Sequence, residues 1–236
     1  MQQRDFKLGL FGRTYLDTIV YLDKIKLGET NKAKYITKTS GGIFNISKAN
    51  IPSLRTYCYS DSQVEAFIIS KSKTSTYDKT STRSSIVHSL SKKTKPTIKE
   101  ELLDWLHVAY VDDLSYVDVL DNLNVKLSLD FCTLDPRGEY MNLINKASLI
   151  FDSRERKPLY NSIKTNTPLI LHDKNGCECI INGESVSRGF TEPMDDIHVN
   201  GAGDIFAGIF LSEYYNSTLD KAIESASRMT SSYLIQ

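Results

Sequence analysis

Short apolar strands and amphipathic helices alternate along the second half of the chain, and this alternation constrains the fold more than any other feature. Strands are expected at residues 107–111, 125–131, 147–151, 169–172 and 177–181. Helices are expected at residues 97–106, 114–123, 140–146, 157–164, 202–215 and 219–234. This spacing is typical of a parallel sheet covered by helices on both faces. The sequence therefore predicts an α/β body.

The first 95 or so residues follow a different pattern, in which strands succeed one another. Residues 6–11, 18–22 and 33–39 are expected as strands, and residues 43–49 have helical character. Residues 70–95 are rich in Ser, Thr and Lys, which fits either a disordered linker or a pair of solvent-facing strands. The chain length of 236 residues allows one domain or two. We predict a small β appendage on the α/β body.

Charge and hydrophobicity exclude some classes of function. The 29 basic and 29 acidic residues give a net charge of zero, which argues against a general polyanion binder and so against nucleic acid as a partner. A local basic patch remains compatible with this balance. The apolar stretch near the N-terminus is too short and too charged for a signal peptide, and no run approaches the roughly 18 apolar residues of a membrane span. We expect a cytoplasmic protein with no membrane partner.

Two glycines and a close pair of cysteines need interpretation. Gly41 and Gly42 separate a strand from a helix, which indicates either close backbone approach to a neighbour or a plain turn. Cys177 and Cys179 are too closely spaced for the usual zinc site, and no second pair exists. Ordinary packing within a strand is therefore favoured over metal binding there. An Asn182-Gly183 hairpin turn is expected to follow that strand.

The most informative stretch lies at residues 197–210. Gly201, Ala202 and Gly203 open an apolar helix, and Asp204 falls in its first turn. Free backbone N–H groups at a helix N-terminus form an anion site. Asp204 is then either a helix-start residue that suits the helix dipole, or a base placed beside a bound phosphate.

This stretch resembles the second signature of the ribokinase-like (PfkB) carbohydrate and nucleoside kinases, whose usual form is Asp-Thr-Thr-Gly-Ala-Gly-Asp. The match covers residues 201–204 and continues through Phe206 and Ala207, while His198, Val199 and Asn200 replace the first three residues. The resemblance implies that Asp204 is the catalytic base. It also implies that Gly201, Ala202 and Gly203 form the anion hole and that Asn200 contacts the nucleotide.

Further segments resemble the same family in the same order. The ones that look like substrate contacts are Gly12 with Asp17 after the first strand, the Gly41-Gly42 pair with Asn45, and Asp130 at a strand end. Asn175 and Gly176 occupy the family's nucleotide turn. Asp152-Ser-Arg-Glu155 stands where the family has Asn-x-x-Glu, which implies Asp152 and Glu155 as the residues that organise Mg²⁺.

The resemblance implies a ribokinase-like three-layer α/β/α fold with a mostly parallel sheet. Residues 1–236 would form a single domain, with a small β-strand lid at about residues 13–40 and 73–90. The implied activity is ATP- and Mg²⁺-dependent phosphorylation of a hydroxyl group on a sugar, a sugar derivative or a nucleoside. The exposed strands of such a lid leave open a homodimer formed through it.

One segment departs from the family pattern. Leu171, His172 and Asp173 replace Thr-x-Gly before the nucleotide turn, which removes a hydroxyl and a glycine and adds a negative charge. The alternative function is therefore a catalytically weak or inactive protein of the same fold that binds a small ligand in a regulatory role. His172 and His198 fall near the nucleotide side, as phosphate contacts or as structural residues, whereas His88 and His107 are expected to be structural.

Overall fold

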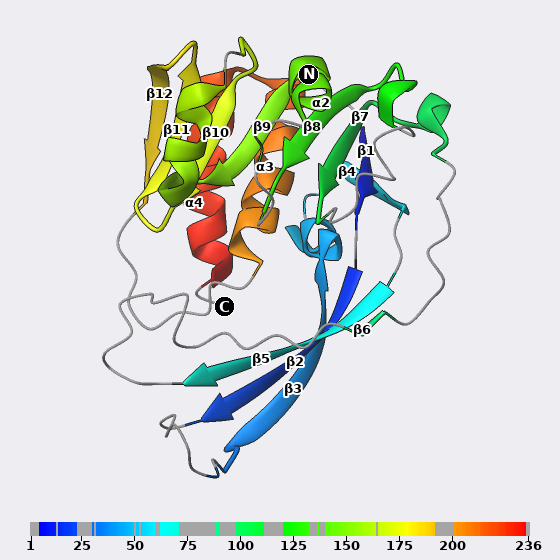
Figure 1. The fold of residues 1–236 in the computed structure, drawn as a ribbon, viewed down its shortest axis with the longest axis vertical. Coiled ribbons are helices and arrows are strands. Elements are labelled where there is room, and N and C mark those ends of the chain that lie inside the picture. Colours follow the sequence, from blue (N-terminus) through cyan, green and yellow to red (C-terminus); the bar gives the residue numbers. More distant parts are fainter. Residues whose placement is uncertain are drawn as a thin grey trace.

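The structure of the chain is a computed structural model. It describes residues 5–12, 14–22, 30, 32–49, 51, 53–59, 62–70, 88–89, 98–110, 120–132, 136, 140–163, 165–191 and 201–234. These residues form a large sheet flanked by helices and a smaller second sheet beside it (Figure 1). His198, Asn200 and most of residues 73–90 lie outside the described residues.

The large sheet has eight strands in the order β12-β11-β10-β9-β8-β7-β1-β4. Their bounds are β1 (Phe6–Phe11), β4 (Leu54–Tyr59), β7 (Trp105–Ala109), β8 (Lys126–Asp130), β9 (Leu149–Ser153), β10 (Leu169–Asp173), β11 (Gly176–Ile181) and β12 (Glu184–Phe190). Neighbouring strands run parallel throughout the series β4, β1, β7, β8, β9 and β10. β11 and β12 add an antiparallel hairpin at the β10 edge. The predicted mostly parallel α/β sheet is confirmed.

Each face of the large sheet has its own hydrophobic core, because side chains alternate along the strands. One core joins Phe6, Leu8, Trp105 and Phe151 to the helices α3 (Ala202–Asn216) and α4 (Leu219–Leu234) and to the 3₁₀ helix η1 (Ile43–Ala49). The other core contains Leu106, Val108, Leu129 and Ile150, together with α2 (Met141–Lys146) and Tyr160 of the 3₁₀ helix η4 (Arg154–Ser162). The sheet is thus the middle of three layers, as predicted.

Helix α3 is apolar around most of its circumference, and its residues 204–212 are all buried. A helix of this kind needs cover on several sides. The large sheet lies on one side of it, and α4 and η1 pack against other sides. The N-terminus of α3 is therefore held firmly at the end of the sheet.

The hairpin at the sheet edge forms through the predicted turn. Asn182 and Gly183 have φ values of 53° and 82°, which a two-residue turn of the I′ type requires at both positions. Cys177 and Cys179 are buried in the core beneath α4, where Cys177 Sγ lies 3.5 Å from Ser227 Oγ. No cluster of three His, Cys, Asp or Glu side chains suited to a metal ion occurs among the described residues.

The second sheet has the strand order β3-β2-β5-β6 and lies apart from the body (Figure 1). Its strands are β2 (Thr14–Leu22), β3 (Tyr35–Gly42), β5 (Ser62–Ser70) and β6 (His88–Ser89). β2 pairs with β3 in the antiparallel sense and with β5 in the parallel sense. The sequence analysis did not assign β5, which extends this sheet into residues 62–70.

The prediction of a helix at residues 97–106 was wrong. A single 3₁₀ turn, η2 (Glu100–Leu102), precedes β7, which begins at Trp105 and is buried along its whole length. The apolar residues at positions 98, 102, 103 and 106 have the spacing of an amphipathic helix, but Trp105 and Leu106 belong to β7. Pairing with β1 on one side and β8 on the other decides the matter in favour of the strand.

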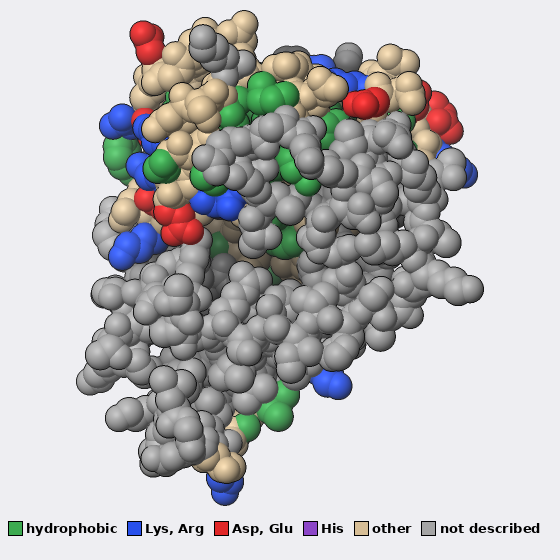
Figure 2. All heavy atoms as spheres, in the orientation of Figure 1, with side chains coloured by type: hydrophobic (Ala, Val, Ile, Leu, Met, Phe, Trp, Pro, Cys, Tyr) green, Lys and Arg blue, Asp and Glu red, His purple; other side chains and the backbone are tan. Residues whose placement is uncertain are grey.

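On the face shown in Figure 2, acidic and basic side chains of the described residues are interspersed. No large patch of one charge sign forms among them there. This agrees with the net charge of zero. The described helices include none with the length and apolar character needed to cross a membrane.

Candidate active site

The candidate site lies where parallel strands of the large sheet end and α3 begins. β8 ends at Asp130, Tyr110 follows directly after β7, and α3 begins at Ala202. In open α/β sheets, ligands bind outside the carboxyl ends of the strands. The location therefore agrees with the sequence prediction for the region around Asp204.

Two glycines at the start of α3 are required by close packing. Gly201 has a φ of 78°, and a Cβ atom there would lie 2.8 Å from Asn45 Nδ2. A Cβ atom on Gly203 would lie 2.9 Å from Cε1 of His172, which projects from β10. The chain therefore needs small residues here so that η1 and β10 can approach the helix end.

The same glycines leave backbone amides at the helix end. The N–H of Ile205 donates to the carbonyl of Gly201 at 3.0 Å, so the amides of residues 202–204 precede this hydrogen bond of the helix. Amides in the first turn of a helix have no intrahelical partner and carry partial positive charge. They suit an anion such as a phosphoryl group.

Asp204 is 4% exposed and is held by side chains from two other elements. Asn45 Nδ2 in η1 donates to Asp204 Oδ2 at 3.1 Å. The hydroxyl of Tyr110 donates to the same oxygen at 2.9 Å. Lys48 Nζ donates in turn to Asn45 Oδ1 at 2.8 Å, which orients the amide toward the carboxylate.

The surroundings of Asp204 bring its pKa to about 7, well above the ordinary value of an aspartate. Burial is the main cause, and the nearby Asp130 carboxylate adds to it. The hydrogen bonds from Asn45 and Tyr110 and the positive charge of Lys48 act in the opposite direction. A carboxylate with a pKa near neutrality is well suited to accept a proton from a hydroxyl group.

Asp130 is the second carboxyl group at this end of the sheet. Burial and the Asp152 carboxylate raise its pKa to about 7. Its Oδ1 accepts a hydrogen bond from the backbone N–H of Cys132 at 2.8 Å. Asp130 thus lies close enough to Asp204 to raise the pKa of the Asp204 carboxyl, and the predicted acceptor and catalytic residues are brought together here.

The glycine pair and Asp17 belong to the second sheet. Gly41 and Gly42 are buried at the end of β3, and η1, which carries Asn45, follows them directly. Gly42 has a φ of 63°, which makes this the point where the chain turns from the strand into the 3₁₀ helix. Asp17 lies in β2, paired with Thr39 of β3.

The predicted metal residues are arranged differently. Asp152 is 1% exposed, and Arg156 Nε lies 2.8 Å from its Oδ1 and 3.0 Å from its Oδ2. Its oxygens also accept hydrogen bonds from the Tyr160 hydroxyl and the Ser153 amide, each at 2.7 Å. Glu155 is exposed in the first turn of η4. Asp152 therefore lies at the same end of the sheet as Asp204 but is bound to its own partners.

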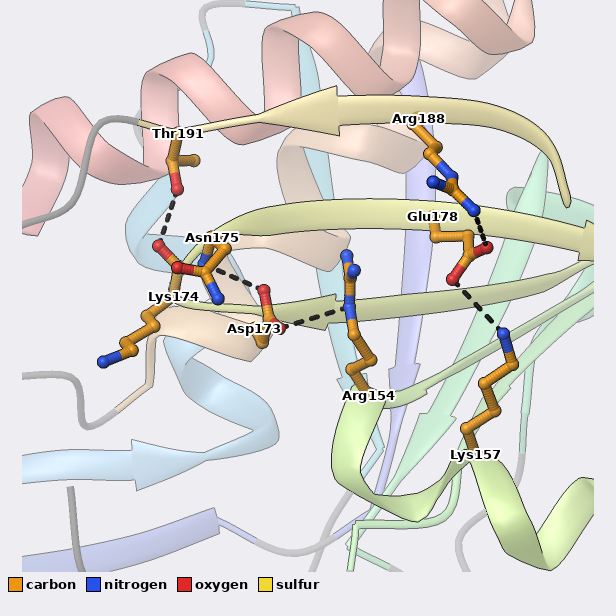
Figure 3. A network of polar contacts seen from close by, with 8 residues as sticks. All are labelled: Arg154, Lys157, Asp173, Lys174, Asn175, Glu178, Arg188 and Thr191. Atoms are coloured by element: carbon orange, nitrogen blue, oxygen red, sulfur yellow. Dashed lines mark hydrogen bonds and ion pairs between the residues drawn. The ribbon is translucent and has the colours of Figure 1, made fainter. Parts of the chain in front are cut away.

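The predicted nucleotide turn joins β10 to β11 (Figure 3). Asp173 Oδ1 accepts a hydrogen bond from the Asn175 amide at 2.8 Å, and its Oδ2 lies 3.2 Å from Arg154 Nε. Thr191 Oγ1 donates to the Lys174 carbonyl at 2.7 Å. The negative charge that replaces the family's glycine is thus paired with Arg154.

Gly176 has a structural reason to be glycine. Its φ is 124°, and a Cβ atom there would lie 2.1 Å from the Gly189 carbonyl oxygen in β12. This close approach requires a glycine whether or not a phosphate binds at the turn.

Figure 3 also shows Glu178, which is nearly buried between two cations. Its Oε1 accepts a hydrogen bond from Arg188 at 3.0 Å, and its Oε2 lies 3.5 Å from Lys157 Nζ. Burial raises the pKa of Glu178, but a hydrogen bond from Ser185 and these two cations outweigh burial and lower it overall. Glu178 is therefore a structural carboxylate of the hairpin.

The histidines divide as expected between core and site. His107 is buried, with Nδ1 2.8 Å from Ser128 Oγ, and burial lowers its pKa to about 3, so it is neutral. The His172 ring lies 5.2 Å from that of Phe206 and against Gly203, directly beside the amides at the start of α3. His172 thus borders the expected anion site.

Sequence analysis missed Tyr110 and Cys132, which follow the ends of the adjacent strands β7 and β8. They have φ values of 57° and 52°, which non-glycine residues seldom adopt and which tend to occur at functional sites. Burial raises the pKa of both groups, so the phenol and the thiol stay protonated. A tyrosine just after a buried strand was the only available signal, and it has no specificity by itself.

Three solved structures show what this arrangement of elements is similar to. Ribokinase from Cryptococcus neoformans var. grubii in complex with ADP is 14% identical, with a TM-score of 0.66 over 94% of this chain and 91% of that chain. Nucleoside kinase from Burkholderia thailandensis in complex with inosine is 12% identical, with a TM-score of 0.68 over 98% and 91%. Adenosine kinase from Sinorhizobium meliloti is 11% identical, with a TM-score of 0.69 over 98% and 94%.

These matches extend over nearly the whole length of both chains in each pair. The chain has the ribokinase fold. The motif order seen in the sequence predicted this fold correctly. No protein-family model matches the sequence, and no curated protein matches it either. The ribokinase fold hosts the site, and the chemistry has to be argued from the side chains themselves.

Proposed function

We propose that the chain is a ribokinase-type kinase that transfers a phosphoryl group to a hydroxyl of a sugar, a sugar derivative or a nucleoside. One observation carries the proposal: a buried carboxylate with a pKa near neutrality sits in the first turn of α3, beside amides suited to an anion. The similar solved structures include kinases for ribose and nucleosides, two of them in complex with ADP or inosine. Their fold places no constraint on which acceptor this chain uses.

Asp204 would act as the general base. It takes the proton of the acceptor hydroxyl while that oxygen bonds to the γ-phosphorus and ADP departs. The amides of Gly201, Ala202 and Gly203 would stabilise the negative charge on the transferred group, in the manner of an oxyanion hole. Because these amides belong to the backbone of a firmly packed helix, they need little reorganisation during the reaction.

The acceptor would bind between the second sheet and the end of the large sheet. Asp17, Gly41, Gly42 and Asn45 would hold its hydroxyl groups, and Asp130 would contribute from β8. Asn45 is well placed for this, since it already contacts Asp204. The second sheet would act as a lid that excludes water, so that the phosphoryl group is not lost to hydrolysis.

The residues present fit a nucleotide phosphate at the start of α3, because the amides of the first helical turn suit an anion. ATP would supply the γ-phosphoryl group, and Asn200, Asn175 and Gly176 would contact it. Direct coordination of Mg²⁺ by Asp152 does not fit the described contacts, because Arg156, Tyr160 and Ser153 already bind both of its oxygens. That Asp152 and Glu155 organise the Mg²⁺ ion stays a prediction, and no step of the reaction is assigned to the ion.

A panel of sugars and nucleosides, assayed for ADP release from Mg·ATP, tests the proposal most directly. At least one acceptor should stimulate ADP release well above the rate without acceptor. The Asp204→Asn variant is the matched control, because asparagine preserves the shape and the hydrogen bonding of the side chain but removes the base. Stimulation that persists unchanged in this variant would contradict the mechanism.

A second candidate function is a non-catalytic, ligand-binding protein of the same fold. The Asp173–Arg154 ion pair favours it, because this pair occupies the turn where a nucleotide phosphate is expected. Calorimetry with Mg·ATP at millimolar concentration separates the two candidates. If Mg·ATP gives no heat of binding, with or without sugars or nucleosides, the result would favour the second candidate and count against the kinase.

A homodimer through the lid is also part of the proposal. Tyr35 and Ile36 in β3, an edge strand of the second sheet, are 48% and 57% exposed. Exposed apolar side chains on a sheet edge favour pairing with another chain. Gel filtration of the chain beside an Ile36→Lys variant tests this, since the variant should shift the elution toward the monomer.

A further inference from the structure

Tyr110 donates a hydrogen bond to Asp204, and neither the sequence motifs nor the proposed mechanism assigns it a part. Its hydroxyl donates to Asp204 Oδ2 at 2.9 Å, and Asn45 Nδ2 donates to the same oxygen at 3.1 Å. Both of these side-chain hydrogen bonds therefore end on Oδ2. A proton that reaches Asp204 from an acceptor would accordingly go to Oδ1.

The backbone of Tyr110 gives this contact its geometry. Its φ of 57° turns the chain sharply at the end of β7 and directs the side chain toward α3. Such a conformation is unfavourable for a residue with a Cβ atom, and it persists only where the surroundings impose it. The neighbouring strand β8 is followed by a second residue of this kind, Cys132, beside Asp130.

We propose that Tyr110 is a positioning residue for the reaction: its hydroxyl holds Asp204 through Oδ2, so that Oδ1 receives the proton of the acceptor. This inference rests on the proposed kinase function. Tyr110 itself exchanges no proton, because it stays a hydrogen-bond donor throughout. Its second effect is electrostatic, since a donor to a carboxylate favours the ionised form and keeps the base competent at lower pH.

Other groups also face Asp204, and they are present with or without the Tyr110 hydroxyl. They are Asn45 and Lys48 from η1, Asp130 and Cys132 from the end of β8, and His172 from β10, which lies against the adjacent Gly203. Of these, Lys48 favours the ionised carboxylate and Asp130 opposes it. All of them remain in place when only the Tyr110 hydroxyl is removed, which makes this hydroxyl testable by itself.

The variant Tyr110→Phe keeps the ring and removes the donor. We expect the pKa of Asp204 to rise by about one unit, because one charge-assisted hydrogen bond is lost. The acid limb of the kcat profile should move to higher pH by the same amount, so that kcat falls about tenfold at pH 6 and much less at pH 9. A tyrosine with a merely structural function would lower kcat equally at every pH.

Tyr233→Phe is the matched control. Tyr233 lies near the end of α4, 37% exposed, and takes no part in the site. Its loss of a hydroxyl should leave both the pH profile and the melting temperature unchanged. Equal shifts of the acid limb in the two variants would overturn the proposal.

Carbon-13 NMR of the ligand-free protein measures the same pKa without any enzymatic assay. The Asp204 carboxyl resonance is identified by its disappearance in Asp204→Asn, and its midpoint should shift upward in Tyr110→Phe only. If no acceptor is ever phosphorylated, the kinase proposal fails while this titration still tests the contact. If acceptors are phosphorylated and the midpoint does not move, the Tyr110 inference fails while the kinase proposal stands.

A second measurement needs no change at Tyr110. In the unaltered chain labelled at tyrosine Cζ, the Tyr110 signal should follow the ionisation of Asp204, because the acceptor of its hydroxyl changes charge. The transition should be absent in Asp204→Asn. A Tyr110 signal that does not change across the titration of Asp204 would overturn the proposed contact.

Discussion

Two regions at the same end of the sheet hold their buried carboxylates with different partners. At the start of α3, Asp204 has hydrogen bonds from the neutral donors Asn45 and Tyr110. At the end of β9, Asp152 is bound at both oxygens by the cation of Arg156. Burial raises the pKa of both carboxyl groups, but Asp152 is also fixed in an ion pair with Arg156, whereas the described hydrogen-bond donors to Asp204 are uncharged. The difference separates a group suited to move a proton from one suited to hold a fold together.

The largest effect should come from removing the first carboxylate. Asp204→Asn is expected to lower kcat on the true acceptor by about a thousandfold, because the general base is lost while the amide retains the hydrogen bonds. Asp173→Asn, in the nucleotide turn, should change kcat by no more than about threefold. Steady-state ADP release measures both. Equal losses of kcat would mean that Asp204 has no greater part in turnover than the carboxylate of the nucleotide turn.

The second largest effect should be on stability, at Arg156. Arg156→Met would leave Asp152 buried without its cation, and the free energy of unfolding should fall by about 3 kcal/mol. Arg154→Met is the matched change, because Arg154 and Asp173 are partly exposed, and it should cost about 1 kcal/mol or less. Urea unfolding at pH 7.5 compares the two. Similar losses would show that Asp152 is not anchored by Arg156.

The next effect in size should be on the pH dependence of stability, and it should come from Asp204. Its folded pKa of about 7 lies above the value near 4 of an unfolded aspartate, so the folded state binds more protons between these values. Stability therefore falls as pH rises through that window. The Asp204→Asn variant does not suffer this loss, so between pH 4.5 and pH 7.5 its stability relative to the parent chain should rise by about 3 kcal/mol. Urea unfolding across this range measures it, and a difference that is constant with pH would contradict the assignment.

The smallest effect should come from packing at Gly203. Gly203→Ala places a Cβ atom 2.9 Å from the His172 ring, and the ring must shift, at a cost of about 1 kcal/mol. His172→Ala should remove that cost, so the two changes should show a coupling of similar size in a double-mutant cycle. Thermal unfolding of the four chains measures the coupling. Additive effects would mean that His172 does not press on the helix end.

Parts of the fold could be predicted because they depend on the pattern of residues over short stretches of the chain. The alternation of strands and helices predicted the layers, and Asn182-Gly183 predicted the edge hairpin through the φ values that such a turn requires. Residues 97–106 were misassigned as a helix, because the apolar residues at positions 98, 102, 103 and 106 have helical spacing although only Trp105 and Leu106 of this segment lie in a strand. β5 was missed in a segment whose neighbours in the sheet are distant in sequence.

The sequence by itself predicted the α/β layers and placed Asp204 in the first turn of a helix, since both follow from spacing along the chain. Only the tertiary structure decided what surrounds that carboxylate. Asn45 and Tyr110 lie 159 and 94 residues away from it along the chain, and no local pattern connects them. Burial and Coulomb interaction depend on distance in space, so the pKa of Asp204, the pairing of Asp152 and the part played by Tyr110 emerge only when the strands are assembled.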